Sequence, residues 1–197
     1  MRLHWSRVIK SFRHKGLDEL FRTGNPRKVQ AKHAKRLRLI LTLLNAAIHA
    51  GQMNAPGLRL HPLKGKLAGR YAVNMDENFR VTFAFERGTQ WKWNMATITE
   101  KSARMANPAH PGEILRDLYL EPMNVTITEV AEALGVSRKH VSAIVNGRAP
   151  VTPDMAMRFA AVFSTEPEVW VNLQAQYDLW DVSRKARPKV KLLRPAA

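Results

Sequence analysis

Two neighbouring segments in the second half of the chain repeat apolar residues at the spacing of an α-helix. Residues three and four positions apart share one face of a helix, so each segment predicts a short helix with one face buried against a partner. The expected buried faces are Val130, Ala131 and Leu134 in the first helix and Val141, Ile144 and Val145 in the second.

Polar residues and glycines mark where these two helices begin and end. Thr126 caps the first helix, and Glu129 three residues later completes a capping box. Gly135 allows the left-handed backbone that a tight turn needs, and Ser137 caps the second helix. The pair Asn146-Gly147 tolerates the conformation that ends it. Two helices around such a turn are typical of a helix-turn-helix, whose second helix enters the major groove of DNA.

The second helix of this pair begins with basic and polar side chains on its outward face. An ordinary helical hairpin also explains the apolar spacing, but it does not explain this basic beginning. Arg138 and Lys139 are the best candidates for base edges or nearby phosphates, whereas Thr126, Asn146 and Arg148 fit backbone contacts better. For each position, an exposed polar side chain without a ligand is the alternative. The predicted DNA-binding residues are Thr126, Ser137, Arg138, Lys139, His140, Ser142, Asn146 and Arg148, with Ala143 as a contact for a thymine methyl group.

Three further helices are predicted around this pair. One opens at residues 110–115 with an early proline, a second begins at 152–154, and the last begins at Pro167. Their methionine and aromatic residues favour a core or a dimer interface over a cofactor site. The pattern therefore predicts an all-α domain of five helices over residues 108–180.

The first half of the chain has a different pattern, in which helical segments precede short strands. One helical segment ends at Gly24, and a second spans residues 32–48 with Lys and Arg on its solvent side. This order predicts a small α+β domain over residues 9–99, with two helices on a short antiparallel sheet, and a junction at 100–107. Strands are expected at residues 9–12, 71–75, 79–86 and 90–97.

Positive charge is concentrated in the first half. Residues 1–104 hold 21 Lys+Arg against 6 Asp+Glu, a net of +15, whereas residues 105–197 hold 11 against 10, a net of +1. This surplus predicts a polyanion partner, most simply RNA, with a solvated basic surface as the alternative. The basic tail at 181–197 predicts added nonspecific DNA affinity, and residues 1–8 are interpreted as an extension without a structural role.

The composition limits the chemistry that the chain can perform. It has no cysteine, which excludes disulfides and thiolate metal sites, and its 7 His residues lack a metal-binding spacing. The longest apolar run is too short to span a bilayer, and no signal-peptide pattern opens the chain. We therefore expect a cytoplasmic protein without membrane contact, metal or cofactor.

Four segments of the first half resemble a known family: IKSFRHKGLDELFRTG, HAKRLRLILTLLNAA, LRLHPLKGKLAGRYAV and NFRVTFAFE. Together they are similar to HigB-type toxins of the RelE/ParE superfamily. The resemblance implies a ribosome-dependent endoribonuclease that cuts messenger RNA. It makes His61 a general acid or base and Lys64 a stabiliser of phosphate charge, although His61 alone is also compatible with a structural loop histidine. Further candidates are Lys66 and Arg70 for RNA binding and Arg80 for catalysis.

The catalytic ending of this family is missing from the chain. Such toxins usually end in Asp-Tyr-His, and alignment from Gly88 places those positions near Thr97, Ile98 and Thr99. In the frame that begins one base earlier, a permitted codon choice for residues 89–100 reads Asp-Ala-Val-Glu-Val-Glu-Tyr-Gly-Asp-Tyr-His and then a stop. We therefore interpret the fusion as the result of a frameshift near Gly88. A gene sequence without this ending in the neighbouring frame would contradict the interpretation.

The segment HPGEIL at residues 110–115 and the helix-turn-helix resemble HigA-type antitoxins of the Xre/Cro family. The resemblance covers residues 105–180 and implies a homodimer on a palindromic operator, with one helix of each copy in a major groove. It also implies contact between the antitoxin and the toxin. The junction reaches roughly 25 Å when extended, and contact within one chain or exchange between two chains is compatible with that length.

Three functions are compatible with this combination of motifs. The first is a DNA-binding antitoxin and autorepressor fused to a toxin domain without its catalytic C-terminus. The second is an active ribosome-dependent mRNA endoribonuclease held in check by its fused antitoxin. The third is an inert or folding-defective product. Operator binding without growth arrest would indicate the first, growth arrest the second, and neither result the third.

Overall fold

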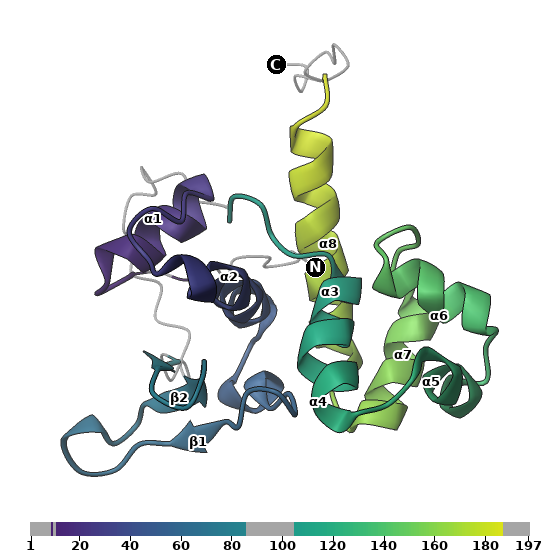
Figure 1. Ribbon diagram of the computed structural model, residues 1–197, viewed down its shortest axis with the longest axis horizontal. Coiled ribbons are helices and arrows are strands. Elements are labelled where there is room, and N and C mark those ends of the chain that lie inside the picture. Colours follow the sequence, from purple (N-terminus) through teal and green to yellow (C-terminus); the bar gives the residue numbers. More distant parts are fainter. Residues whose placement is uncertain (1–8, 10, 86–104, 187–197) are drawn as a thin grey trace, which may run out of the picture.

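The computed structural model describes residues 9, 11–85 and 105–186, which form an α+β N-terminal part and a helical C-terminal part (Figure 1). His14 caps the first helix by accepting from the N–H groups of Gly16 and Leu17, and Gly24 ends it in the left-handed conformation. The elements of the N-terminal part are α1 (Lys15–Thr23), α2 (Ala31–Ala46), the 3-10 helices η1 (Ala50–Met53) and η2 (Gly65–Leu67), and the strands β1 (His61–Pro62), β2 (Tyr71–Asn74) and β3 (Arg80–Phe83).

The three strands form one antiparallel sheet in the order β1-β2-β3. Val73 pairs with Val81 across β2 and β3, and both side chains are buried in the main apolar cluster. Strands β2 and β3 occupy the predicted positions but are shorter than expected. β1 was not predicted, because a strand of two residues carries no alternation pattern. The strand expected at 90–97 lies outside the described residues.

The strand predicted at residues 9–12 is wrong, since residues 9, 11 and 12 have no strand structure. The N–H of Ile9 instead donates to the side-chain oxygen of Asn45 at 3.2 Å. Phe12 packs on Phe21 of α1 with ring centroids 5.2 Å apart. The segment therefore packs on α1 and α2, and its alternating apolar residues reflect these contacts.

The C-terminal part begins with three consecutive helical segments where one helix was predicted. Pro122 explains the irregularity, because it has no N–H to donate to the carbonyl of Leu118 four residues earlier. Helical bonding changes to a π pattern before this proline. The elements are α3 (Pro111–Leu115), the π-helix η3 (Arg116–Leu120), α4 (Glu121–Met123), α5 (Ile127–Leu134), α6 (Arg138–Val145), α7 (Pro153–Phe163) and α8 (Pro167–Ser183).

Aromatic residues fill the core of the C-terminal part. Trp170 of α8 is completely buried and lies 4.9 Å from the ring of Phe159 in α7 and 5.3 Å from that of Tyr119 in η3. The Trp170 indole N–H donates to the hydroxyl of Thr165 at 2.9 Å, so its polar atom is satisfied. The aromatic stripe of the sequence is therefore core, which fixes α7 and α8 behind the helix-turn-helix.

The N-terminal and C-terminal parts pack against each other through α2, which contacts both α3 and α8 (Figure 1). Apolar residues of both parts belong to one buried cluster. Within the single chain of this structure the two parts are in contact, and exchange between two chains stays a prediction. Members of the cluster on the two sides include Leu39, Ile40, Met53 and Leu58, and Met105, Ala109, Leu115 and Leu118.

Replacing Gly112 with alanine is expected to destabilise the C-terminal part strongly. A Cβ on Gly112 in α3 would lie 1.8 Å from the carbonyl oxygen of Ile144 in α6, so the two helices would have to separate. Alanine normally favours a helix over glycine, whereas here overpacking should cost about 1–3 kcal/mol or more. Urea unfolding measures the decrease in stability. A variant as stable as the parent would contradict the close approach of α3 and α6.

Candidate nucleic-acid interfaces

The helix-turn-helix is formed by α5 and α6 with the predicted caps in place. The Thr126 hydroxyl accepts from the N–H of Glu129, and the Glu129 carboxylate accepts from the N–H of Thr126 at 2.7 Å. Gly135 ends α5 with φ of 65°. Ser137 caps α6 by accepting from the N–H of His140 at 3.3 Å. The predicted apolar faces are buried, so the opposite face of α6 is directed away from the core.

The predicted DNA-binding residues lie on this outward face and at its borders. Thr126, Ser137, Arg138, Lys139, Asn146 and Arg148 are exposed, while His140, Ser142 and Ala143 are half-buried. Among the described residues, no carboxylate forms an ion pair with Arg138, Lys139 or Arg148. Three cations near one helix therefore remain available to an external anion.

Two of the predicted contacts have internal partners. The amide nitrogen of Asn146 donates to the carbonyl of Ser142 at 2.7 Å, so it also ends α6. Ser137 and Thr126 use their hydroxyls as helix caps. These interactions fix the orientation of the side chains without excluding a further bond to phosphate.

Sequence reasoning missed Arg158 of α7. Its guanidinium donates to the carbonyl of Leu134 at 2.7 Å and pairs with Asp154 at 2.8 Å. It therefore satisfies a carbonyl at the end of α5 and fixes the turn before α6. No local pattern marks this role, because Arg158 and Leu134 are 24 positions apart.

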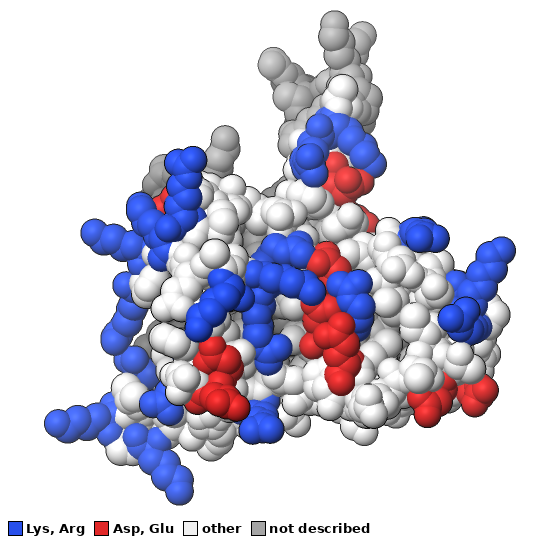
Figure 2. Space-filling view, viewed as in Figure 1, with Lys and Arg blue, Asp and Glu red and all other residues white. Residues whose placement is uncertain are grey.

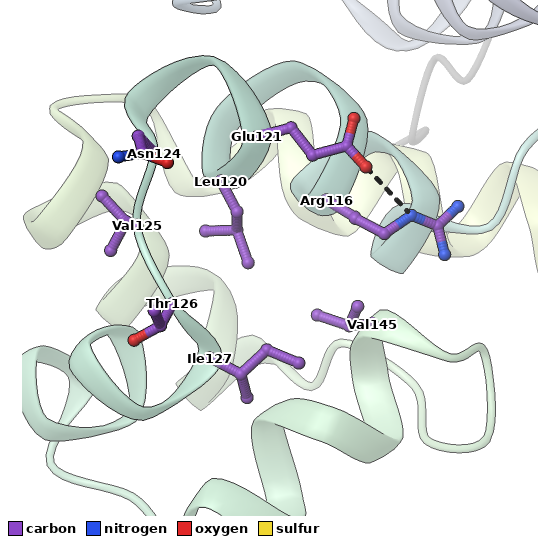
Figure 3. A pocket seen from close by; sticks show the side chains of 8 residues that line it. All are labelled: Arg116, Leu120, Glu121, Asn124, Val125, Thr126, Ile127 and Val145. Atoms are coloured by element: carbon purple, nitrogen blue, oxygen red, sulfur yellow. Dashed lines mark ion pairs between the residues drawn. The ribbon is translucent and has the colours of Figure 1, made fainter.

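A groove next to the beginning of α5 separates η3 and α4 from the end of α6 (Figure 3). Arg116 and Glu121 form an ion pair of 4.0 Å on its wall. Thr126, whose hydroxyl belongs to the capping box, also lines it. The remaining lining residues are Leu120, Asn124, Val125, Ile127 and Val145, so the groove contains no pair of catalytic groups.

The N-terminal part carries the second candidate site on its β1–β2 hairpin. His61 lies in β1, and its ring nitrogen Nδ1 is 3.0 Å from the carbonyl oxygen of Arg59. Lys64 precedes η2 in the hairpin loop, where it and Lys66 are exposed, and Arg70 is half-buried just before β2. In Figure 1 the hairpin extends away from the C-terminal part, which leaves this site uncovered by it.

Strand register places His61 and Arg80 on the same face of the sheet. His61 pairs with Ala72, and Arg80 pairs with Asn74, two residues further along β2. Side chains two positions apart on a strand share a face, so all four belong to one face. Val73 and Val81 belong to the opposite face and are buried, and Ala72 on the His61 face is buried as well. The structure thus places two of the residues predicted as catalytic on one face of the sheet, on strands separated by β2. Positions 97–99, where the family has Asp-Tyr-His, lie outside the described residues.

Positive charge lies along the outer edge of the N-terminal part and at the far end of the C-terminal part (Figure 2). Near the middle of this view, basic and acidic side chains meet where α2 packs on α3. The two candidate interfaces are therefore separated by a region in which opposite charges pair.

His110 holds the beginning of α3 beside the end of α6. Its Nδ1 accepts from the N–H of Gly112 at 3.0 Å, and its ring lies 4.8 Å from Tyr177. Burial lowers the pKa of His110 below its ordinary value, although Glu113 and Asp178 raise it partly. Protonation of Nδ1 would also remove the helix cap, so the neutral ring is the stable form.

We expect the stability of the C-terminal part to fall as the pH decreases below 6.5, the ordinary pKa of His110. Because its pKa is lowered in the folded state, its contribution is complete above 6.5 and is lost as the pH falls through the folded value. His110→Asn retains a capping side chain but does not titrate. Urea unfolding of both proteins at several pH values should show a smaller pH dependence for the variant. Parallel profiles would contradict this role.

The sequence matches two families in the same order as the two parts. Residues 10–94 match the RelE-like toxin of the type II toxin–antitoxin system HigB, and residues 116–170 match the helix-turn-helix family. Over 87 residues the chain is 37% identical to the endoribonuclease HigB of Proteus vulgaris, covering 44% of this chain and 95% of that protein.

The C-terminal part has curated relatives of its own. It is 39% identical over 88 residues to antitoxin HigA-1 of Vibrio cholerae serotype O1, covering 45% of this chain and 83% of the antitoxin. It is 46% identical over 85 residues to YbaQ, an uncharacterized HTH-type transcriptional regulator of Escherichia coli K12, covering 43% of this chain and 75% of the regulator.

The fold and its two sites define a toxin–antitoxin fusion. The N-terminal part of the chain belongs to the HigB-like toxin family, and the C-terminal part belongs to the helix-turn-helix family that includes HigA antitoxins. Residues 9–85 are called the toxin half below, and residues 105–186 the antitoxin half. Of the helices in the described part of the chain, none is both long and apolar enough to cross a membrane.

Proposed function

We propose that this protein is a sequence-specific DNA-binding antitoxin and autorepressor that carries a HigB-like toxin half without nuclease activity. The observation that carries the proposal is the complete helix-turn-helix, with Arg138, Lys139 and Arg148 exposed and without acidic partners among the described residues. Such cations supply phosphate contacts and base readout at the beginning of a recognition helix. A repressor of this kind acts on chromosomal or plasmid DNA, so we place it in the cytoplasm.

The proposed DNA complex contains two copies of the chain. A dimer would place one α6 in each of two successive major grooves of a palindromic operator. Support for a second copy comes from the antitoxin half, where Met157, Leu179 and Val182 are 62%, 52% and 60% exposed. Leu179 and Val182 lie three residues apart on α8, on one helical face. We propose that this face contributes to the dimer.

An active messenger-RNA endoribonuclease is the second candidate function. The observation in its favour is that His61 and Arg80 share a sheet face that the antitoxin half leaves uncovered. In that function His61 would transfer a proton, Lys64 and Arg80 would stabilise the phosphate, and Lys66 and Arg70 would bind RNA on the ribosome. The residues near Thr97–Thr99 provide no equivalent of the family's Tyr or His, so we favour the repressor.

Two measurements on the full-length chain test the proposal. A DNA duplex is selected from a random pool by the chain, and growth is followed when the chain is expressed. Selection of a defined sequence without growth arrest would support the repressor, and growth arrest with messenger-RNA cleavage would support the nuclease. If neither occurs, the chain is an inert fusion product and the proposal fails.

A further inference from the structure

We propose that the toxin half is a fixed structural part of the repressor: its helix α2 holds α3, and α3 positions the recognition helix α6. The inference rests on the proposed DNA-binding function. It assigns to the toxin half a role that requires neither RNA nor catalysis. In Figure 1, α3 lies between α2 on one side and α6 on the other, and both pairs of helices are in contact.

Polar contacts fix α2 on α3 in one register. The Thr42 hydroxyl of α2 accepts from the N–H of Ala109 at 3.0 Å, in a buried position just before α3. One turn earlier on α2, Arg38 pairs with Glu113. A further turn earlier, Lys35 pairs with Asp117 at 2.7 Å. Successive turns of α2 thus each have a partner on the antitoxin half.

The carboxylate of Asp117 pairs with one cation from each half of the chain. It is nearly buried and is shared by Lys35 of the toxin half and Arg116 of the antitoxin half. Burial alone would raise its pKa, but the hydrogen bonds from the two cations hold the pKa below its ordinary value. Removal of the toxin half would leave this carboxylate with one cation fewer.

A second contact between the halves lies at the interruption of the helix before Pro122 in the antitoxin half. The carbonyl of Leu118, which Pro122 cannot satisfy, accepts from the N–H of Gly57 in the toxin half at 3.0 Å. A Cβ on Gly57 would lie 2.9 Å from the Pro122 ring and 3.3 Å from the Leu118 carbonyl oxygen. The backbone of the toxin half therefore completes the hydrogen bonding of the antitoxin helix, at a distance that favours glycine.

Helix α8 holds the other side of α2. The Asn172 side chain donates to the carbonyl of Ala46 at 3.1 Å, and the Gln176 side chain donates to the carbonyl of Thr42 at 3.4 Å. At the beginning of α8, Glu166 accepts from Gln52 and lies 2.7 Å from His49. Helix α2 therefore contacts both α3 and α8, and it adds to the direct contact that His110 makes with Tyr177 of α8.

The opposite side of α3 determines the position of α6. Gly112 allows α3 to approach the carbonyl of Ile144 so closely that a Cβ would lie 1.8 Å from it. His110 lies against Gly147, 3.6 Å from the position of a Cβ there, directly after α6. Ala109, whose N–H donates to the Thr42 hydroxyl, immediately precedes His110 in the chain. A shift of α3 at the toxin interface must therefore move α6 or open the α3–α6 contact.

The test uses Thr42 in the full-length chain and two fluorescent duplexes. One is the duplex that the parent chain selects from a random pool, and the other is a scrambled duplex of equal length. Thr42→Val removes the acceptor for Ala109 but keeps the side-chain shape, whereas Thr42→Ser keeps the hydroxyl. Arg38→Ala removes the cation paired with Glu113. Arg22→Ala is its matched control, since the ion pair that Arg22 forms among the described residues is with Asp18 on its own helix.

Thr42→Val and Arg38→Ala are expected to weaken binding to the selected duplex by about 5-fold or more, the smallest typical size of coupling between sites. Binding to the scrambled duplex should stay unchanged for Thr42→Val. Thr42→Ser and Arg22→Ala should bind the selected duplex as the parent does. Circular dichroism and urea unfolding identify any variant that does not fold.

The possible outcomes distinguish this inference from the proposed function. If the parent chain selects no sequence, the DNA-binding function itself fails. If the parent selects a sequence and folded Thr42→Val and Arg38→Ala bind it with parental affinity, the repressor stands and the role of the toxin half is overturned. If Thr42→Val does not fold, Arg38→Ala against Arg22→Ala decides the question alone. The inference is supported if Thr42→Val and Arg38→Ala both bind the selected duplex more weakly while Thr42→Ser binds it as the parent does.

Discussion

Replacing both Arg138 and Lys139 with alanine is expected to weaken binding to the selected DNA sequence by roughly 100-fold or more, because a base-edge contact contributes about 1–3 kcal/mol of discrimination. Both side chains are exposed at the first two positions of α6, and no described carboxylate pairs with either. Neither side chain contributes to the core, so the fold should remain intact. Fluorescence anisotropy with the selected duplex measures the change in affinity.

The matched control removes the same charge from the toxin half. Arg22 and Lys28 are exposed cations that pair with Asp18 and Glu19 of α1. Replacing these two with alanine should leave the specific affinity within about twofold of the parent, because their charges do not belong to the α6 interface. For the Arg138 and Lys139 variant, the slope of affinity against salt should also fall by about 1 for each cation that no longer binds a phosphate. Equal affinities of both double variants would exclude α6 as the recognition helix.

Restoring the expected toxin ending should turn a harmless chain into a growth-arresting one. In this variant, the continuation after Gly88 is replaced by the expected ending Asp-Ala-Val-Glu-Val-Glu-Tyr-Gly-Asp-Tyr-His and a stop, which also removes the antitoxin half. The full-length natural chain is expected to allow normal growth, since the family's terminal Tyr and His have no equivalent in Thr97–Thr99. General acid–base groups contribute about 10²–10⁴-fold to a rate, so their return should produce messenger-RNA cleavage that primer extension detects.

His61 provides the control for this experiment. It lies in β1 on the face that also carries Arg80, and it makes no contribution to the buried cluster. His61→Ala in the restored chain should abolish growth arrest while the protein remains folded. Arrest by the natural fusion would contradict the requirement for the terminal Tyr and His. Equal arrest by the restored chain with and without His61 would show that the catalytic assignment of His61 is wrong.

The local elements were accessible from the sequence because neighbouring residues determine them. The capping box of Thr126 and Glu129, the turn at Gly135 and the cap at Ser137 are all interactions within four residues. The apolar faces of α5 and α6 follow from helical spacing alone and are buried as expected. Strand β1 could not be found in this way, since its two residues are defined only by their pairing with β2.

Predictions from short-range sequence patterns were wrong or incomplete where a residue distant in sequence provides the hydrogen bond. Residues 9–12 alternate like a strand, yet Ile9 bonds to Asn45, 36 positions away. The single helix expected after His110 is interrupted by a π-helix before Pro122, and its Leu118 carbonyl bonds to Gly57 of the other half. Arg158 fixes the turn of the helix-turn-helix from α7, and neither its sequence position nor its neighbours indicate this.

The sequence by itself determined that two families are joined in this chain, where the two helices of the helix-turn-helix lie, and which residues are candidates for DNA binding and catalysis. These properties depend on residue type and local spacing, which one chain displays directly. Only the tertiary structure decided that α2 packs against both α3 and α8, with Thr42, Arg38 and Lys35 each bonded to the antitoxin half. Such contacts join residues more than 60 positions apart, and they form because buried polar groups and charges need partners wherever the packed helices bring them.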